Sequence, residues 1–301
     1  MTFSPQQQQT LEYFSKFADD WRSKAANKDP KRKFNVIKAR NDYVLDVTKA
    51  MGSAKRGLDI GCGTGELVVD WGKMGIQGVG VDFAPDMIKL CKEMAEEQKI
   101  PNVEFIEASI FEYTPEQKFD VIGANGFIEY VSLEEFGQLL KRMPELLNPG
   151  GSFVVGSRNR LFNVFSLNEF TEMELKAGAV NELVEEATLI AKSADMQSAV
   201  KALEASPASK LPVHTSHPST TGIEVAVRHQ YTPKEIIHFL RDHGMKTVRF
   251  GAVHQHAFPP RFKESHLPVH IQVADLLQSL AWDQPSLVPS ASTFMVEATM
   301  A

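Results

Sequence analysis

Three alternating glycines, Gly61, Gly63 and Gly65, are the residues whose type and spacing point most directly to chemistry. They follow an apolar run in the stretch LDIGCGTGE. Because glycine carries no Cβ, it lets a ligand or another segment approach the backbone closely. A strand that passes through such a loop into a helix presents unpaired N–H groups, which suit a nucleotide-type ligand. The loop therefore predicts a ligand-binding site at this turn, which we call the glycine-loop corner, although the glycines can also serve the turn alone.

The side chains around this loop argue against a phosphate-bearing ligand. The dinucleotide fingerprint G-x-G-x-x-G has its third glycine one residue later, where this chain has Glu66, and the G-K-[ST] ending of a Walker loop is absent. A glutamate at the start of a helix repels a pyrophosphate. Asp82 ends the next predicted strand, where a carboxylate can accept from both hydroxyls of a ribose. S-adenosylmethionine, which has a ribose and no phosphate, fits these residues.

The elements that must position these residues alternate between strands and helices. This alternation predicts an α/β fold, a Rossmann-like seven-stranded and mostly parallel sheet with helices on both faces. Strands are expected at residues 57–60, 78–82, 103–106, 119–124, 152–157, 245–253 and 292–299, and helices between them at 66–73, 86–97, 133–147 and 233–243.

The remaining segments divide the chain into regions. Helices are expected after Ser4 and over 36–51, residues 166–205 have a helical composition, and 206–222 and 257–291 are expected to be irregular. We expect N-terminal helices that close over the cofactor, an α/β core, and a mostly helical lid or substrate insertion, for which a dimerisation arm is the alternative. The three regions are 1–52, then 53–160 with 229–301, and 161–228.

The stretch LDIGCGTGE followed by VGVDFAPDMI resembles the first two motifs of class I S-adenosylmethionine-dependent methyltransferases that act on small molecules. The resemblance runs from Leu58 to Ser157, resumes at YTPKEIIHFLRDHGM and covers somewhat under half of the chain. It implies that Asp82 holds the ribose, that Phe83 and Met87 flank the adenine, and that the chain after the fourth strand receives the methionine ammonium. The implied cofactor-binding residues are Tyr13, Trp21, Gly61, Cys62, Gly63, Asp82, Phe83, Met87, Ser109, Ile110, Asn125 and Gly126.

The methyl acceptor must be recognised elsewhere, and the histidines indicate where. All nine lie between His214 and His270. His254 and His256 follow the sixth predicted strand, where alternate residues share a face, and we predict them as catalytic residues, one of them the base for a hydroxyl acceptor. A metal site from these histidines with His214 and His217 lacks cysteine or carboxylate ligands at matching spacing, so no metal is expected. The predicted substrate residues are Tyr130, Arg158, Arg160 and His229.

Composition limits the partners. The net charge of −6 gives no general attraction to nucleic acid or anionic lipid, and no apolar run approaches the eighteen residues of a membrane span. The polar N-terminus and the two cysteines favour a cytoplasmic protein. We expect a small-molecule O-methyltransferase with no nucleic-acid or membrane partner, and a homodimer is an open alternative to a monomer. Transfer to nitrogen or carbon, and a cofactor-binding scaffold without activity, are the alternatives.

Overall fold

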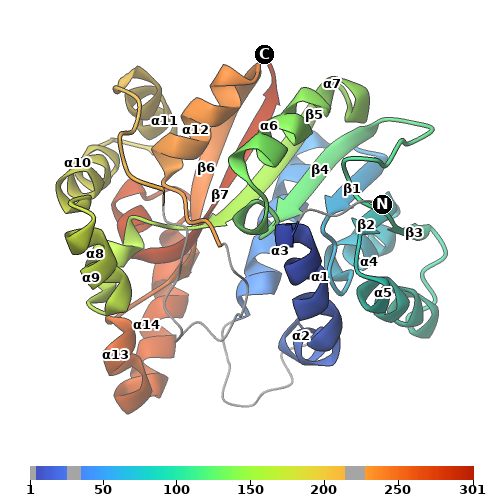
Figure 1. Ribbon diagram of the computed structural model, residues 1–301, viewed down its shortest axis with the longest axis horizontal. Coiled ribbons are helices and arrows are strands. Elements are labelled where there is room, and N and C mark those ends of the chain that lie inside the picture. Colours follow the sequence, from blue (N-terminus) through green and yellow to red (C-terminus); the bar gives the residue numbers. More distant parts are fainter. Residues whose placement is uncertain (1–4, 26–34, 214–227) are drawn as a thin grey trace. The chain divides into compact units, whose positions relative to one another are not determined.

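The computed structural model describes residues 5–25, 35–213 and 228–301 (Figure 1). These residues form two compact units. The first unit holds the described residues up to Gly156 together with the last three residues of the chain. The second unit holds the described residues from Ser157 to Ala298.

A seven-stranded sheet confirms the predicted α/β fold. Its strand order is β3-β2-β1-β4-β5-β7-β6, and the pairs β1/β2, β1/β4, β2/β3 and β4/β5 are parallel. In a parallel sheet of this kind, ligands bind beyond the carboxyl ends of the strands. The strands are β1 (Arg56–Ile60), β2 (Gln77–Asp82), β3 (Val103–Glu107), β4 (Phe119–Asn125), β5 (Leu147–Arg158), β6 (Met245–Gln255) and β7 (Ala291–Met300).

The first unit surrounds its strands with helices whose ends follow the sequence. Asn35 caps α3 by accepting from the N–H of Lys38, and Gly52 ends that helix at φ 66°. Trp71 is fully buried, and its indole N–H donates to the hydroxyl of Thr48 over 3.1 Å, which ties α4 to α3. The helices are α1 (Pro5–Lys16), α2 (Ala18–Ala25), α3 (Val36–Met51), α4 (Glu66–Lys73), α5 (Pro85–Glu97), the short η1 (Ile128–Tyr130), α6 (Leu133–Lys141) and α7 (Met143–Leu146).

The second unit carries the predicted helical insertion and the helix after it. Thr232 and Glu235 form a capping box at the start of α12. Asn168 caps α9 and Asp195 caps α11, so their polar side chains, rather than long apolar runs, set where these short helices begin. The helices are α8 (Phe162–Ser166), α9 (Glu169–Lys176), α10 (Val180–Ala191), α11 (Met196–Ala205) and α12 (Pro233–Asp242).

Two predictions about local structure are wrong. The helix expected over 133–147 is divided at Arg142, because Pro144 suits the first turn of a new helix rather than the interior of an old one. The stretch 257–291 is not irregular, since prolines that suggested loops stand at helix starts instead. It contains α13 (Pro260–Lys263), η3 (Glu264–His266), α14 (Leu267–Leu280) and η4 (Pro285–Ser290).

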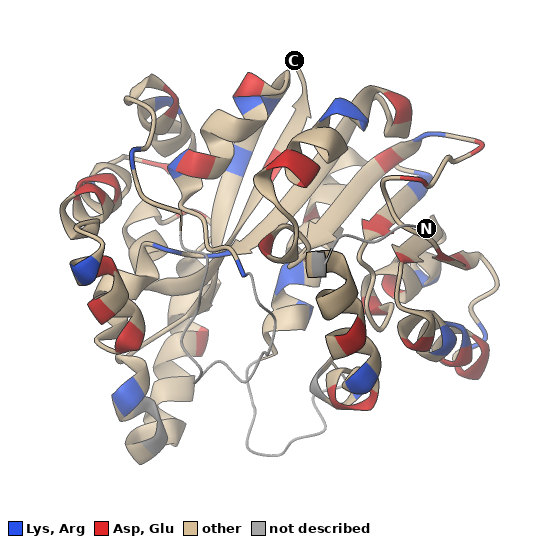
Figure 2. Ribbon diagram, viewed as in Figure 1, with Lys and Arg blue, Asp and Glu red and all other residues tan. Residues whose placement is uncertain are grey.

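Basic and acidic side chains are interspersed along the helices of each unit (Figure 2). This mixture fits the modest net charge of −6 and a solvated surface. Among the described helices, none has the length and apolar character needed to cross a membrane.

Candidate functional site

The glycine loop between β1 and α4 has the conformation that only glycine adopts easily. Gly61, Gly63 and Gly65 have φ angles of 66°, 52° and 84°. A Cβ added at Gly65 would lie 2.9 Å from the sulfur of Cys91, whereas a Cβ added at Gly63 would meet nothing within 4 Å. Gly65 is therefore needed for packing, and Gly63 leaves open space where a ligand can approach the backbone.

Asp82, at the end of β2, holds this loop in place. One carboxylate oxygen accepts from the N–H of Gly63 over 3.0 Å, and the other accepts from the N–H of Ala84 over 2.9 Å. Burial raises the pKa of Asp82 from 3.8 to about 6, against the lowering effect of these hydrogen bonds. The side chain stands beside Gly63, where it was predicted to hold a ribose.

Two further carboxylates lie at the same corner, and the sequence analysis did not assign either to the site. Asp59, in β1, is 5% exposed, and its pKa is raised well above 3.8 by burial and by the charges of Asp82 and Glu66. Burial also raises the pKa of Glu66, which accepts from the hydroxyl of Thr64. The charges of Asp82 and Glu66 both oppose the ionisation of Asp59, so the three carboxylates lie close together.

The last residue of β4 presents a buried acceptor. The amide nitrogen of Asn125 donates to Asn41 over 2.9 Å, while its amide oxygen is buried without a partner among the described residues. Gly126 has φ 72°, and a Cβ there would lie 2.6 Å from the guanidinium of Arg40. That guanidinium pairs with the buried Glu129 over 3.2 Å. The ion pair supports the turn that holds Asn125, and neither partner was predicted from the sequence.

The N-terminal helices α1 and α2 pack within this same unit. Phe14 and Trp21 pack against a buried cluster that contains Ala84 and Met87. The ring of Phe14 meets Tyr130 edge-to-face at 5.3 Å. Tyr130, predicted to contact substrate, is thus engaged with α1. Met87 is 1% exposed and belongs to the core beneath these helices.

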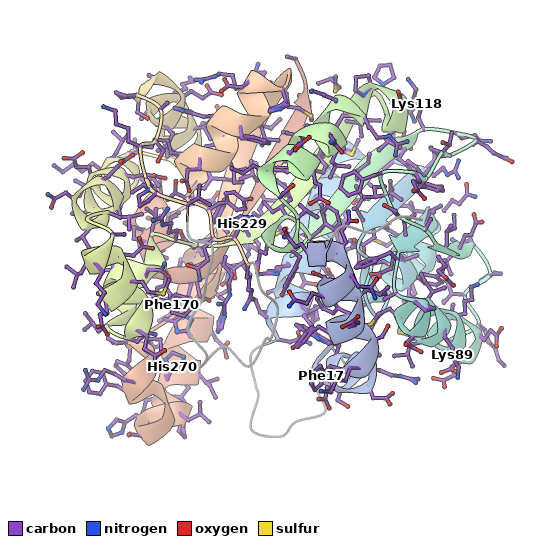
Figure 3. The ribbon with its side chains drawn as sticks, viewed as in Figure 1. Phe17, Lys89, Lys118, Phe170, His229 and His270 are labelled. Atoms are coloured by element: carbon purple, nitrogen blue, oxygen red, sulfur yellow. The ribbon has the colours of Figure 1, made fainter. Side chains whose placement is uncertain are left out.

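The other predicted cofactor residues lie in the same unit as the glycine loop, in three different environments. Tyr13 is buried and stacks near Phe17, which lies between α1 and α2 (Figure 3). Cys62 is 7% exposed and packs in the apolar cluster around Cys91, so its side chain serves the core. Phe83, Ser109 and Ile110 follow the ends of β2 and β3, and the main chain there is joined by a 3.0 Å bond from the N–H of Ala108 to the carbonyl of Asp82.

The second unit brings the predicted catalytic histidines together. The ring centroids of His254 and His256 are 4.5 Å apart, and His256 also lies 4.5 Å from the ring of Phe162. His270, on α14 (Figure 3), is 5.6 Å from His256 and was not assigned a role from the sequence. Ser292, on β7, lies 2.9 Å from Nδ1 of His254. No signal in the sequence pointed to these last two, because both contacts join distant segments.

The two arginines predicted for substrate binding have different surroundings. Arg160 is 1% exposed and forms a two-bond ion pair with the buried Glu174, at 2.9 and 2.8 Å. This geometry favours a structural role over the predicted substrate clamp. The guanidinium of Arg158 lies 5.9 Å from the ring of Phe170, which Figure 3 labels on α9. His229 is buried, which lowers its pKa, and its ring lies 5.9 Å from that of Tyr231.

The histidines show no metal-binding arrangement where the structure describes them. No group of three or more His, Cys, Asp or Glu residues among the described ranges has the spacing to hold an ion. His214 and His217, considered above as metal ligands, lie outside those ranges, as does Ser4.

A comparison with protein families shows what kind of protein contains this glycine loop and Asp82. The family model described as "Methyltransferase domain" matches residues 52–227, more than half of the chain. The chain belongs to this methyltransferase family. The match confirms the resemblance that the glycine loop and Asp82 suggested, and its start at residue 52 places the whole loop inside the methyltransferase domain.

Curated relatives of this methyltransferase carry the name ubiquinone biosynthesis O-methyltransferase. The one from Bradyrhizobium sp. (strain ORS 278) is 32% identical over 164 residues, which are 51% of this chain and 63% of the relative. The one from Coxiella burnetii (strain RSA 331 / Henzerling II) is 30% identical over 168 residues, 55% of this chain and 69% of the relative. The chain thus spans less than two thirds of the length of the first of these relatives.

Solved structures share the fold of this methyltransferase at low sequence identity. Magnesium protoporphyrin IX methyltransferase from Synechocystis PCC 6803, solved with bound SAH, has a TM-score of 0.55 and 13% identity, covering 97% of this chain and 98% of the other. The 1,6-didemethyltoxoflavin-N1-methyltransferase of Burkholderia thailandensis has a TM-score of 0.53 and 14% identity, covering 100% and 92%. At such identity the likeness establishes the fold.

Proposed function

We propose that this methyltransferase transfers the methyl group of S-adenosylmethionine to a hydroxyl oxygen of a small molecule. The observation that carries the proposal is the charge of the glycine-loop corner. Asp59, Glu66 and Asp82 gather there, and burial raises the pKa of each, so a bound cation would favour the ionised forms that burial disfavours. Such a corner repels a pyrophosphate and attracts a cation. S-adenosylmethionine carries both a sulfonium and an ammonium group, and a ribose for Asp82.

The residues present fit this cofactor. The open space at Gly63 admits a ligand against the backbone, and the unpartnered oxygen of Asn125 is an acceptor for the methionine ammonium. Asp82 would accept from the ribose, since its ionised oxygens have lone pairs beyond those used by Gly63 and Ala84. The bound cofactor would supply an electrophilic methyl group on its sulfonium.

The chain's contribution to methyl transfer is alignment, exclusion of water and removal of a proton. Orientation of reactants supplies about 7–11 kcal/mol of the barrier in ideal cases. The packing of Phe14 and Trp21 over the cluster around Ala84 would keep water from the cofactor. A hydroxyl acceptor must also lose a proton, and a histidine with a pKa near neutrality is the usual base. We propose His254 or His256 for that step.

The choice of oxygen rests on the curated relatives, whose printed names are O-methyltransferases at 32% and 30% identity. The proposed substrate residues are Arg158, His229 and Tyr130. Arg160 is not proposed to bind substrate, because its guanidinium donates two hydrogen bonds to Glu174.

A label-transfer assay tests the function. The full chain is incubated with S-adenosylmethionine labelled in its methyl group and with matched pairs of small acceptors that differ only in a hydroxyl or an amine. We expect label in the hydroxyl member of a pair and loss of transfer in Asp82→Asn. Label only in amines would refute oxygen as the acceptor, and absence of cofactor binding would refute the proposal as a whole.

A further inference from the structure

The turn over residues 109–113, which follows β3, is closed by its own backbone and joined to β2. The N–H groups of Glu112 and Tyr113 both donate to the carbonyl of Ser109, over 3.0 and 2.9 Å. Just before the turn, the N–H of Ala108 donates to the carbonyl of Asp82 over 3.0 Å. The turn is therefore fixed beside the end of β2.

The side chain of Arg142 reaches this turn from the junction of α6 and α7. Its Nη1 donates to the carbonyl of Ile110, and its Nη2 donates to that of Tyr113 over 2.6 Å. The Arg142 side chain is 17% exposed, and its Nε lies 3.5 Å from the exposed carboxylate of Glu145. Because a guanidinium presents its donors in a rigid planar fork, it fixes the positions of both carbonyls at once.

The strand order determines which part of S-adenosylmethionine would meet this turn. The order begins β3-β2-β1-β4. Asp82, the proposed ribose acceptor, ends β2, and Asn125, the proposed acceptor for the ammonium, ends β4. The amino-acid part and the base are attached to opposite sides of the ribose. A cofactor that extends from Asp82 toward β4 therefore has its adenine on the side of β3, where the turn follows the strand.

The backbone of the turn presents a donor to such a base. The carbonyl of Ser109 points into the turn, toward the N–H groups that donate to it. In a trans peptide the N–H points opposite to the carbonyl, so the N–H of Ile110 points out of the turn. The ring nitrogens of adenine are acceptors. The carbonyls of Ile110 and Tyr113, which would repel these nitrogens, are directed to Arg142 instead.

We propose that Arg142 is a positioning residue that holds the turn 109–113 so that the N–H of Ile110 donates to a ring nitrogen of adenine, and that the site thereby selects adenine over its deaminated form. The inference rests on the proposed binding of S-adenosylmethionine. In hypoxanthine, the deaminated base, a ring nitrogen at the edge next to the exocyclic group carries a hydrogen, so a donor would face a donor. Ile110 is 4% exposed, and a buried donor without a partner is costly.

The experiment is calorimetric titration of the full chain with S-adenosylhomocysteine and with S-inosylhomocysteine, which differ only in the base. We expect wild type to bind the adenosyl ligand about 5- to 150-fold more tightly, the cost of a buried donor without its partner. In Arg142→Ala this ratio should fall by about 2- to 13-fold, the value of one ordinary hydrogen bond. A general loss of structure would weaken both ligands alike and cancel in the ratio.

Arg56→Ala is the matched control. Arg56 begins β1, at the opposite end of the strands, and its Nη1 donates to a loop carbonyl, that of Gln117, over 3.2 Å. This variant also loses an arginine that holds a loop, but its ratio of the two affinities should equal the wild-type ratio. An equal fall in Arg56→Ala and Arg142→Ala would overturn the role of Arg142.

Equal binding of the two ligands by wild type would overturn the inference, and so would an unchanged ratio in Arg142→Ala. If Arg142→Ala fails to fold, Arg142→Lys decides, because a single ammonium lacks the fork that spans both carbonyls. A wild-type ratio in that variant would then refute the role of Arg142. The same titrations separate the two proposals. Equal binding of both ligands refutes only the inference, whereas absence of binding of S-adenosylmethionine and of both ligands refutes the proposed function.

Discussion

Replacement of Asp82 by asparagine separates the stability of the glycine loop from its use in binding. Asparagine keeps the shape of the side chain and one acceptor oxygen, but it turns the other oxygen into a donor. The backbone N–H of Gly63 or that of Ala84 therefore loses its partner, and a ribose hydroxyl loses a charged acceptor.

The expected loss of binding follows from the contacts that are removed. Hydrogen bonds to a charged group contribute about 1.5–3 kcal/mol, so the dissociation constant for S-adenosylmethionine should rise about 10- to 150-fold. Stability should behave differently. A pKa raised from 3.8 to about 6 means that ionised Asp82 costs the folded state about 3 kcal/mol at pH 8. After the loss of one amide partner, the unfolding free energy of the variant should equal the wild-type value or exceed it by up to about 2 kcal/mol.

Asp120→Asn is the matched control, because Asp120 also accepts from two backbone amides. One carboxylate oxygen of Asp120 accepts from the N–H groups of Lys55 and Arg56 over 2.8 and 3.0 Å. Asp120 lies at the start of β4, whereas Asp82 lies at the end of β2. This variant should lose stability and keep its cofactor affinity. Isothermal titration calorimetry gives the affinities and urea unfolding at pH 8 gives the stabilities. Equal dissociation constants for wild type and Asp82→Asn would refute the placement of the ribose.

Four other outcomes follow from the same structure. Cofactor affinity of the wild type should fall by up to tenfold per pH unit below about pH 6, because the proton on Asp82 competes with the ribose; a flat calorimetric profile from pH 5 to 8 would contradict this. Burial raises the pKa of Glu186 from 4.5 to about 7, so the native state binds the extra proton and the contribution of Glu186 to stability should fall by about 3 kcal/mol as pH rises from 4.5 to 7; Glu186→Gln should remove that share of the pH dependence in urea unfolding. Gly65→Ala should destabilise the fold by about 1–3 kcal/mol through overpacking against Cys91, whereas Gly63→Ala should chiefly lower the affinity for the cofactor. A larger loss of thermal stability in Gly63→Ala and a larger loss of affinity in Gly65→Ala would contradict these roles. Arg160→Ala should cost about 3–5 kcal/mol by leaving Glu174 buried and unpaired, whereas Arg158→Ala should cost far less, which thermal unfolding will measure.

Local patterns explain why the first unit was predictable. The glycine loop and the end of β2 depend on neighbours a few residues apart, and both were visible in the sequence. Asp59 was visible too, two residues before Gly61, but its burial beside two other carboxylates depends on how β1 and β2 pair. The sequence therefore showed Asp59 but not its burial beside the other carboxylates.

The second unit was harder to predict because its contacts join distant segments. The short spacing of His254 and His256 was sufficient to predict that they meet, and their rings are 4.5 Å apart. Ser292 and His270 come from elements far along the chain, so no spacing connects them to the cluster. Arg160 was assigned to substrate because its partner Glu174, fourteen residues away on α9, was not foreseeable as buried.

The most direct test of the central claim is a calorimetric titration of the wild-type chain at pH 7.5 with S-adenosylmethionine and, in parallel, with the dinucleotide NAD. A loop with three neighbouring carboxylates, of which Asp59 and Asp82 are buried, and with an open glycine should bind the cationic methyl donor and show no heat of binding with the pyrophosphate-bearing dinucleotide. Binding of NAD, or of neither ligand, would contradict the account.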